Sequence, residues 1–212
     1  MRQFIFLLLF SASASAQAVS VGFKSGLPVT AQIRTYGSDA NTLLDTGRWT
    51  VGPTVELRLI YGFSVEADAL YGGYRVQQTF ASPEFMFEGV TSPAYVSVWR
   101  SDNKIWDFPV LLKYRFGSRS YRPFVDAGYT WRHRSSDLTS TLICLGSQSA
   151  CSSEYFRSGV TQRTGSSVNS GPTAGVGVEF KYGRVTIAPE ARFTHLSNPT
   201  TNNLNLLVGF TF

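Results

Sequence analysis

The sequence contains little that would hold a cofactor or carry the chain across a membrane as a helix. Among its 212 residues are only two cysteines, two histidines and two methionines. The longest apolar run, Phe4–Phe10, has seven residues, whereas a membrane-spanning helix needs about 20. The sequence therefore predicts no transmembrane helix, and we expect neither a cofactor nor a metal site.

Charge is also sparse and nearly balanced. Charged residues make up 16% of the chain, and the formal net charge is +5. The excess is spread over positions such as Arg119, Arg122 and Arg184, without a basic stripe. A nucleic-acid-binding protein would concentrate basic residues on one face, so we expect no nucleic-acid partner.

The amino-terminal segment has the organisation of a secretory signal. A short basic start is followed by the apolar run Phe4–Phe10 and by small residues at Ala14–Ala16. This order is typical of a removable signal peptide, so we predict a signal at residues 1–16 and one mature domain over residues 17–212. The alternative is a buried first helix, although no capping residue starts it.

The carboxy-terminal residues alternate with a period of two. One face carries Leu204, Leu206, Val208, Phe210 and Phe212. Such alternation predicts an amphipathic strand rather than a helix. A last strand that ends on an aromatic residue resembles the terminal strand of bacterial outer-membrane β-barrels, which implies that Phe210 and Phe212 form a signal for the barrel assembly machinery.

Seven further segments show the same alternation, and the segments between them alternate in length. The predicted strands are Val19–Lys24, Thr50–Leu59, Phe63–Tyr71, Ile105–Phe116, 125–131, Pro172–Tyr182 and 185–193. Long polar segments at 25–49, 76–104 and 133–170 alternate with short turns, which is typical of outer-membrane barrels. Because proline lacks a ladder donor, we expect Pro172 to start its strand and Pro109 and Pro189 to mark bulges.

The charged residues of these strands fall on the face opposite the apolar one. They are Lys24, Glu56, Arg58, Glu66, Asp68, Asp107, Lys113, Arg115, Asp126, Arg132, Glu179, Lys181, Glu190 and Arg192. A soluble barrel would show the reverse, with an apolar interior. The fold class predicted is therefore all-β: an eight-stranded antiparallel up-and-down transmembrane β-barrel with a polar, charge-filled interior.

Seven acids and seven bases make up this inward set, so it has the composition to neutralise itself. Because an eight-stranded barrel is only wide enough for its own side chains, we interpret the set as a salt-bridged plug. Inward Gly128, Gly175 and Gly177 are expected to make room for long basic side chains. The alternative is that the carboxylates serve acid–base catalysis or an ion path.

Several stretches resemble one family. They are Asp107–Phe116, Arg122–Gly128, Gly177–Phe180 and Pro189–His195. Together they resemble the small eight-stranded outer-membrane β-barrel domain proteins, distant relatives of the OmpA transmembrane domain. The resemblance implies a monomer in the bacterial outer membrane, with both ends of the barrel chain in the periplasm. It also implies contact with outer-membrane lipids and lipopolysaccharide.

The two cysteines, Cys144 and Cys151, lie seven residues apart in the third long segment. A secreted chain passes through an oxidising compartment, so a disulfide is the first interpretation. The alternative, a metal pair, has only His133 as a nearby imidazole, whereas a closed site needs four ligands.

The stretch His195-Leu196-Ser197-Asn198 resembles the His-x-Ser-Asn motif of the outer-membrane lipid A 3-O-deacylases. The resemblance implies that His195 acts as the base and Ser197 as the nucleophile towards a lipid ester. Those enzymes also use a Glu shortly downstream, and residues 198–212 contain no acid. The alternative is a polar rim residue followed by a Ser-Asn-Pro turn.

Function is expected to lie in the long segments rather than in catalysis. We expect a non-enzymatic outer-membrane barrel with a structural or surface-exposed binding role. Basic residues of the long segments, such as Arg75, Arg100 and Lys104, are candidates for contact with lipopolysaccharide phosphates. A deacylase-like esterase is the first alternative, and a small pore is the second.

Overall fold

The computed structural model describes residues 19–29, 41–87, 90–117, 121–146, 151, 158–197 and 201–212. The main sheet contains β1 (Val19–Pro28), β2 (Asn41–Arg58), β3 (Phe63–Asp68), β4 (Leu70–Ser82), β7 (Tyr95–Arg115), β8 (Tyr121–Cys144), β9 (Gly159–Tyr182), β10 (Val185–Leu196) and β11 (Thr201–Thr211). A separate hairpin is formed by β5 (Phe85–Phe87) and β6 (Val90–Ser92). No helix in the described residues is long and apolar enough to cross a membrane, which does not bear on crossing by strands.

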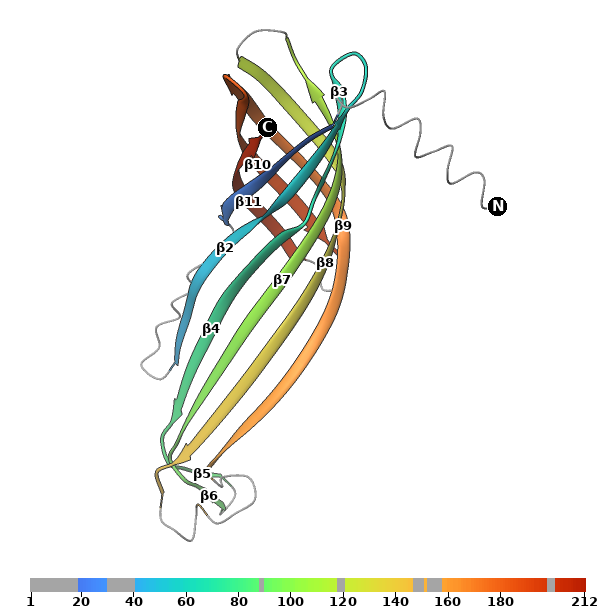
Figure 1. The fold of residues 1–212 in the computed structure, drawn as a ribbon. Coiled ribbons are helices and arrows are strands. Elements are labelled where there is room, and N and C mark those ends of the chain that lie inside the picture. The colour runs from blue at the N-terminus through green and yellow to red at the C-terminus, as the bar shows by residue number, and fades with distance from the viewer. Residues whose placement is uncertain are drawn as a thin grey trace, which may run out of the picture.

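The main sheet closes on itself. All its pairings are antiparallel, and β1 pairs with both β11 and β2, which joins the two ends of the chain into a ring. Strands β3 and β4 are one extended segment interrupted at Ala69 (Figure 1). When these two are counted as one strand, the nine strands of the sheet form an eight-stranded ring. The predicted eight-stranded antiparallel architecture is confirmed.

Two prolines explain the interruption between β3 and β4. The Ala69 amide donates to the Pro53 carbonyl of β2 at 3.0 Å, but Pro53 has no N–H to donate in return. On the other side, the register that pairs Ala67 with Val110 places Pro109 opposite Asp68. The ladder therefore weakens at two adjacent residues, Asp68 on the β7 side and Ala69 on the β2 side, while the strand stays extended.

The predicted bulges at prolines are wrong. The pairing of β7 with β8 runs without a register shift past Pro109, and β9 keeps one register with β10 on both sides of Pro189. Pro172 does not start its strand either, because β9 begins at Gly159. Instead, its missing donor lies where the ladder between β9 and β10 stops, next to the last paired residue, Thr173.

The short turns and both ends of the barrel chain share one rim. Tyr61 and Gly62 have positive φ values of 56° and 83°, and Gly183 has 62°. Such conformations suit tight hairpins. The Phe212 amide donates to the Val21 carbonyl at 3.0 Å, so the chain ends beside its first strand.

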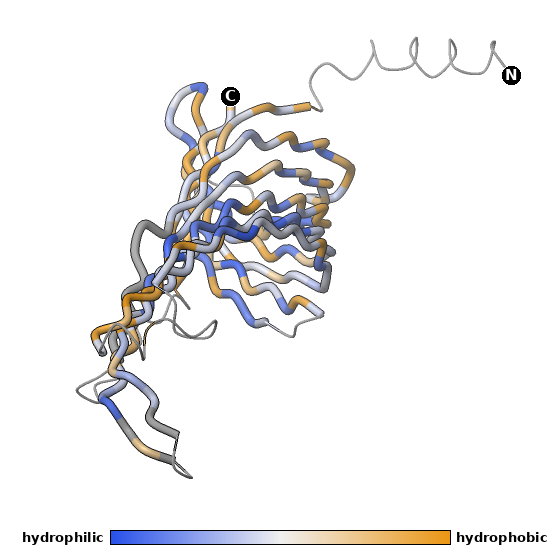
Figure 2. Tube along the Cα trace, turned by 90° about the horizontal axis from the view of Figure 1, so that it is seen from below, coloured by the Kyte–Doolittle hydropathy of each residue, from blue (hydrophilic) through white to orange (hydrophobic). Residues whose placement is uncertain are grey.

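The two faces of the ring differ as the sequence pattern predicts. On β7, Leu112 is 51% exposed on the outside, while the next residue, Lys113, is 2% exposed inside. Exposed apolar and buried polar residues alternate along the strands of the ring, and Figure 2 shows the corresponding alternation of hydrophobic and hydrophilic residues along the tube. Aromatic rings pack against each other at both rims, for example Phe63 against Tyr114 at the short-turn rim and Tyr71 against Trp106 at the rim next to the arm, as in the aromatic girdles of membrane barrels.

The strands differ greatly in length. Strands β1, β10 and β11 have 10, 12 and 11 residues, close to the roughly 9–11 that cross a bilayer. Strands β7, β8 and β9 have 21, 24 and 24 residues. The extra length forms a sheet that extends beyond the ring (Figure 1). We call this sheet the arm, and it comprises residues 41–49 of β2, 73–82 of β4, 95–104 of β7, 135–144 of β8 and 159–167 of β9.

The prediction of long loops is wrong for most of the residues that form the arm. Most of the segments 76–104 and 133–170 is hydrogen-bonded strand, not loop. These residues lack the apolar alternation of the ring, but they are rich in threonine, serine and valine, of which the β-branched residues favour strands. The sheet therefore continues where the apolar pattern ends.

Candidate functional site

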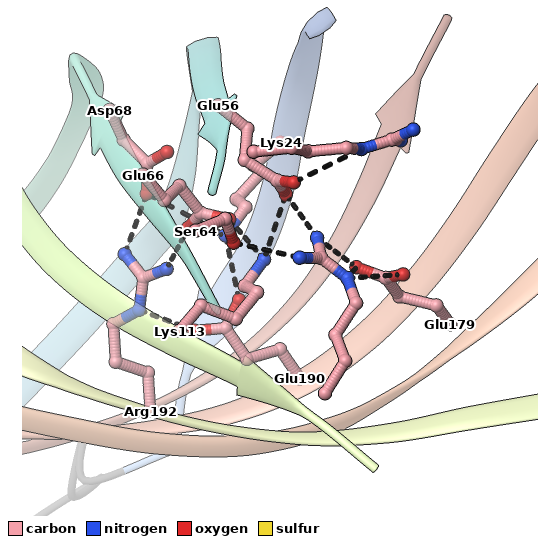
Figure 3. Close-up of polar contacts among 11 residues, drawn as sticks. Lys24, Glu56, Ser64, Glu66, Asp68, Lys113, Glu179, Glu190 and Arg192 are labelled. Atoms are coloured by element: carbon pink, nitrogen blue, oxygen red, sulfur yellow. Dashed lines mark hydrogen bonds and ion pairs between the residues drawn. The ribbon is translucent and has the colours of Figure 1, made fainter. Parts of the chain in front are cut away.

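Arg192 is the centre of an ionic cluster in the ring interior. Its guanidinium contacts Glu190 at 2.5 Å, Asp68 at 2.7 Å and Glu66 at 3.0 Å. Lys24 from β1 contacts Glu66, and it reaches Glu190 at 2.7 Å. Figure 3 shows these side chains converging from strands far apart in sequence. One cluster therefore ties β1, β3 and β10 together across the interior.

Arg115 is the centre of a second cluster nearer the short-turn rim. Its Nε lies 2.8 Å from both carboxylate oxygens of Glu179, its Nη1 donates to the Ser64 hydroxyl at 2.7 Å, and its Nη2 contacts Glu56 at 2.5 Å. Lys113 contacts Glu66 and lies 3.6 Å from Glu56. Lys113 thus connects the two clusters.

The remaining inward charges lie towards the two rims. Arg132 binds Asp107 through two contacts of 2.6 and 2.7 Å at the end of the ring next to the arm. Arg58 is half-exposed and lies 3.5 Å from Glu56. Lys181 is exposed near the Gly183 turn, and no ion pair in the described part of the chain includes it. The predicted set of fourteen is therefore not one enclosed network.

Asp126 is the exception within the interior. It is 3% exposed, and neither carboxylate oxygen has a hydrogen-bond partner among the described residues. A Cβ added at Gly175 would lie 2.5 Å from its Oδ1, so the glycine makes room for this carboxylate. The composition of the inward set predicts that its acidic and basic side chains pair with each other. In the structure, one buried acid has no direct hydrogen-bond partner among the described residues.

Apolar side chains fill part of the interior as well. Phe124, Leu111 and Leu207 are almost fully buried there, and the Lys113 ammonium lies 4.5 Å from the centroid of the Phe124 ring. A Cβ at Gly177 would collide with that ring at 2.3 Å. The expectation that Gly175 and Gly177 accommodate long basic chains is therefore wrong, because an acid and an aromatic ring occupy the space.

His195 and Ser197 are both exposed on the outer face near the end of β10. The Nδ1 atom of His195 lies 2.7 Å from Asn202 Oδ1 on β11. The Ser197 hydroxyl donates instead to the Ser170 carbonyl on β9 at 2.8 Å. Their hydrogen bonds run to opposite neighbouring strands, so this geometry does not bring base and nucleophile together. Asn198 lies outside the described residues.

The arm carries charge and a surface depression at its base. Cys144 and Cys151 form a disulfide at its far end, with Cα atoms 5.8 Å apart. A depression of about 520 Å³ is lined by Trp49, Gly73, Tyr74, Arg75, Asp102, Asn103, Lys104 and Asp137. Trp49 also packs on Tyr71 at 5.6 Å between ring centroids. The depression therefore borders the aromatic residues at the rim of the ring next to the arm, which include Tyr71 and Trp106.

No metal centre is present in the described residues, where no three His, Cys, Asp or Glu side chains are grouped to hold an ion. The ionic clusters consist of opposite charges in contact, which is the pattern of a structural network.

The candidate site residues lie in three regions of the molecule. These are the ionic clusters of the ring interior, the rim around His195 and the base of the arm.

The chain belongs to the outer membrane protein beta-barrel domain family, whose model matches residues 4–212. The protein is accordingly an outer-membrane β-barrel. No curated protein matches the sequence.

Solved structures similar to this chain are small outer-membrane proteins. Ail, the attachment invasion locus protein of Yersinia pestis, is 12% identical with a TM-score of 0.42, and the match covers 92% of this chain and 97% of Ail. Neisserial surface protein A is 10% identical with a TM-score of 0.45, covering 91% and 94%. The N-terminal barrel domain of OprF from Pseudomonas aeruginosa is 15% identical with a TM-score of 0.40, covering 92% and 97%.

Proposed function

We propose that this protein is a non-enzymatic binding protein of the cell surface, in which a plugged barrel anchors a rigid arm outside the outer membrane. One observation carries the proposal. Five strands stay hydrogen-bonded after β1, β10 and β11 have ended, and they form a single-layer sheet. Within the described residues no second layer of sheet covers the arm, so its surfaces are available to partners.

The interior supports an anchor rather than a pore. Four basic side chains contact carboxylates of other strands in the middle of the ring: Arg192, Arg115, Lys113 and Lys24. An eight-stranded barrel has room only for such side chains. We therefore assign the clusters a structural role, and we expect no conductance when the protein is inserted in a planar bilayer.

The lengths of the connections support the proposed orientation. Outer-membrane barrels have short periplasmic turns and long extracellular segments, so the proposal has the arm outside the cell and both barrel ends in the periplasm. Residues 1–16 would act as the secretory signal, and Phe210 and Phe212 as the signal for assembly. Phe210 stacks on Phe23 of the first strand at 5.0 Å, so the same ring also helps to seal the barrel.

Basic residues at the base of the arm support a proposed contact with lipopolysaccharide headgroups. Lys104 and Arg75 line the depression above the Trp49–Tyr71 aromatic pair, and aromatic girdles lie at headgroup level. Basic side chains at that level can form charge-assisted bonds with phosphate. Asp102 and Asp137 partly neutralise them, so we expect a contact that orients the arm rather than a tight site.

A lipid esterase is the alternative function, supported by the contact between His195 and Asn202. It would require Ser197 to turn from the Ser170 carbonyl towards the imidazole. Lipid A from cells that express the wild-type protein is compared with lipid A from cells that express Ser197→Ala. We expect identical acylation, and a wild-type-specific loss of an acyl chain would establish the esterase.

The binding role is tested with an arm-shortened variant. Residues 76–101 and 136–165 are each replaced by an Asn-Gly turn, which joins the paired residues Arg75 and Asp102, and Ser135 and Ser166. Both proteins, in lipid nanodiscs, are applied to an array of lipopolysaccharides, polysaccharides and extended peptides. We expect ligands that bind only the full-length protein, and equal binding by both proteins to every ligand would contradict the proposal.

A further inference from the structure

Strand β9 has a different neighbour along its two halves. From Gly159 to Phe180 it pairs with β8 on one side. On its other side, the ladder with β10 extends only from Tyr182 to Thr173, followed by an isolated bridge between Ser170 and Ser197. Within the described residues, the segment 159–167 has no strand on that side, so the arm ends there in an open sheet edge.

The hydrogen bonds identify which backbone groups lie on this edge. The Ser197 amide donates to the Ser170 carbonyl at 3.1 Å, so Ser170 directs its backbone groups away from β8. In an antiparallel strand, N–H and C=O of one residue point the same way, and the direction alternates from residue to residue. The register of β9 with β8 is continuous, so Val160, Gln162, Thr164 and Ser166 also direct both groups to the open edge.

This edge lacks the usual protection against strand addition. Proteins guard exposed edges with lysines, prolines, bulges or very short strands. Residues 159–167 contain no lysine or proline and a single charge, Arg163, and their pairing with β8 shows no bulge. All nine residues are exposed, and Gly159, Gly165, Ser166 and Ser167 leave space for another backbone.

A second copy in the same membrane does not fit this edge. Copies that share one membrane are related by an axis along its normal, and barrel strands tilt by about 35–45°. Two symmetry-related β9 strands would then cross at about 70–90°, whereas strands in a sheet differ by about 20–25°. The occupant must therefore be a segment that can align freely.

We infer that the arm binds an extended polypeptide segment of an extracellular partner, which adds as a strand to β9 along residues 160–166. The inference rests on the proposed function, because it names the binding mode of the arm. Only a peptide backbone supplies donors and acceptors that alternate at the spacing of these four residues. Affinity in such complexes comes from main-chain hydrogen bonds, so the edge accepts diverse sequences.

The test uses an eight-residue peptide that copies Ser135–Leu142 of β8, the segment that already pairs with β9 on its other side. Peptide binding to the full-length protein in nanodiscs is followed by amide hydrogen exchange. We expect saturable slowing of exchange at Val160, Gln162, Thr164 and Ser166. Exchange that stays unchanged at these amides at saturating peptide, or slows uniformly along the arm, would overturn the inference.

Thr164→Pro removes one edge donor without removing a donor to β8, and Thr164→Val is the matched control that keeps it. We expect the proline variant to bind the peptide up to about tenfold more weakly, the value of one net hydrogen bond, and the valine variant to bind normally. Equal binding by both variants would contradict strand addition.

Two N-methylated peptides make the test independent of how the proline variant folds. One is methylated at its odd positions and the other at its even positions, so only one of them keeps the donors that face β9. We expect one to bind and the other to fail, and equal binding of the two would refute strand addition. If array ligands bind the arm but ignore Thr164→Pro, the binding role stands and this mode fails.

Discussion

The ring and the arm are built from the same strands but have different surroundings. Along β8, Val125 is exposed and Asp126 buried in the ring, whereas in the arm Asp137 is exposed and Leu138 half-exposed. The hydrogen-bonded ladder is continuous through both regions. The comparison shows that backbone pairing forms the sheet, while the medium on each face determines which side chains the strand carries.

Ion pairs illustrate the same difference. The side chains of Arg192 and Asp68 in the ring are 2% and 0% exposed. Those of Arg75 and Asp102 in the arm are 57% and 40% exposed. Water and salt screen the second pair, whereas the first pair cannot be broken without leaving buried charge.

The largest difference is expected from removing the arginine of each pair. Arg192→Met leaves Glu66, Asp68 and Glu190 with too little positive charge, so we expect a loss of about 3–5 kcal/mol in the free energy of unfolding. Arg75→Met should cost about 0–1 kcal/mol. Urea unfolding in lipid vesicles measures both, and similar losses would contradict the contrast.

A new outward charge should also separate the two regions. Val110 lies on the outer face of the ring, between the two aromatic sets, and Thr139 lies on the same face of the arm. We expect Val110→Arg to destabilise the barrel by about 2–4 kcal/mol, the cost of arginine at the membrane midplane. Thr139→Arg should have almost no effect on the same unfolding curves. If Val110→Arg is tolerated equally well, the outer face of the ring does not meet lipid.

The disulfide should act on the arm alone. Replacing Cys144 and Cys151 by serine removes a crosslink that closes a short loop at the end of β8. On the chain-entropy model, such a loop contributes about 2–3 kcal/mol, and we expect the loss to appear as faster amide exchange near residue 144. The urea midpoint of the ring should not change, and a shifted midpoint would mean that the two regions unfold together.

A gain in stability is expected at the unpartnered acid. Asp126→Asn removes a buried charge and keeps the shape next to Gly175. Because an unsatisfied buried group costs about 1–3 kcal/mol, we expect the free energy of unfolding to rise by up to that amount. Asp137→Asn in the arm is the control and should change little. A loss of stability in Asp126→Asn would show that the carboxylate has a partner.

The sequence predicts the ring better than the arm, for a physical reason. Contact with lipid on one face and a closed interior on the other imposes the alternation seen at residues 204–212. The same alternation predicts which residues of each ring strand face outward. Beyond the ring the alternation disappears, so the pattern predicts a loop at residues 133–144, where the structure has the end of β8. Their β-branched content was the available signal.

Details of the interior also depend on information that strand phase does not contain. Phase places Asp126 and Lys181 on the inward side, but the stagger between strands decides their depth. One is buried without a direct partner and the other reaches solvent. The effects of Pro53 and Pro172 likewise depend on which neighbouring strand each missing donor would have faced.

Amide exchange along β9 of the free protein tests the central claim most directly, because this strand runs through both regions. Next to β10, we predict protection at successive amides, such as those of Gly175, Val176 and Gly177. In the arm, we predict slow exchange at Thr161, Arg163 and Gly165, which face β8, and fast exchange at Gln162, Thr164 and Ser166, which face the open edge. Uniformly fast exchange from 160 to 166 would show that the arm is not a sheet, and uniformly slow exchange would show that its edge is covered.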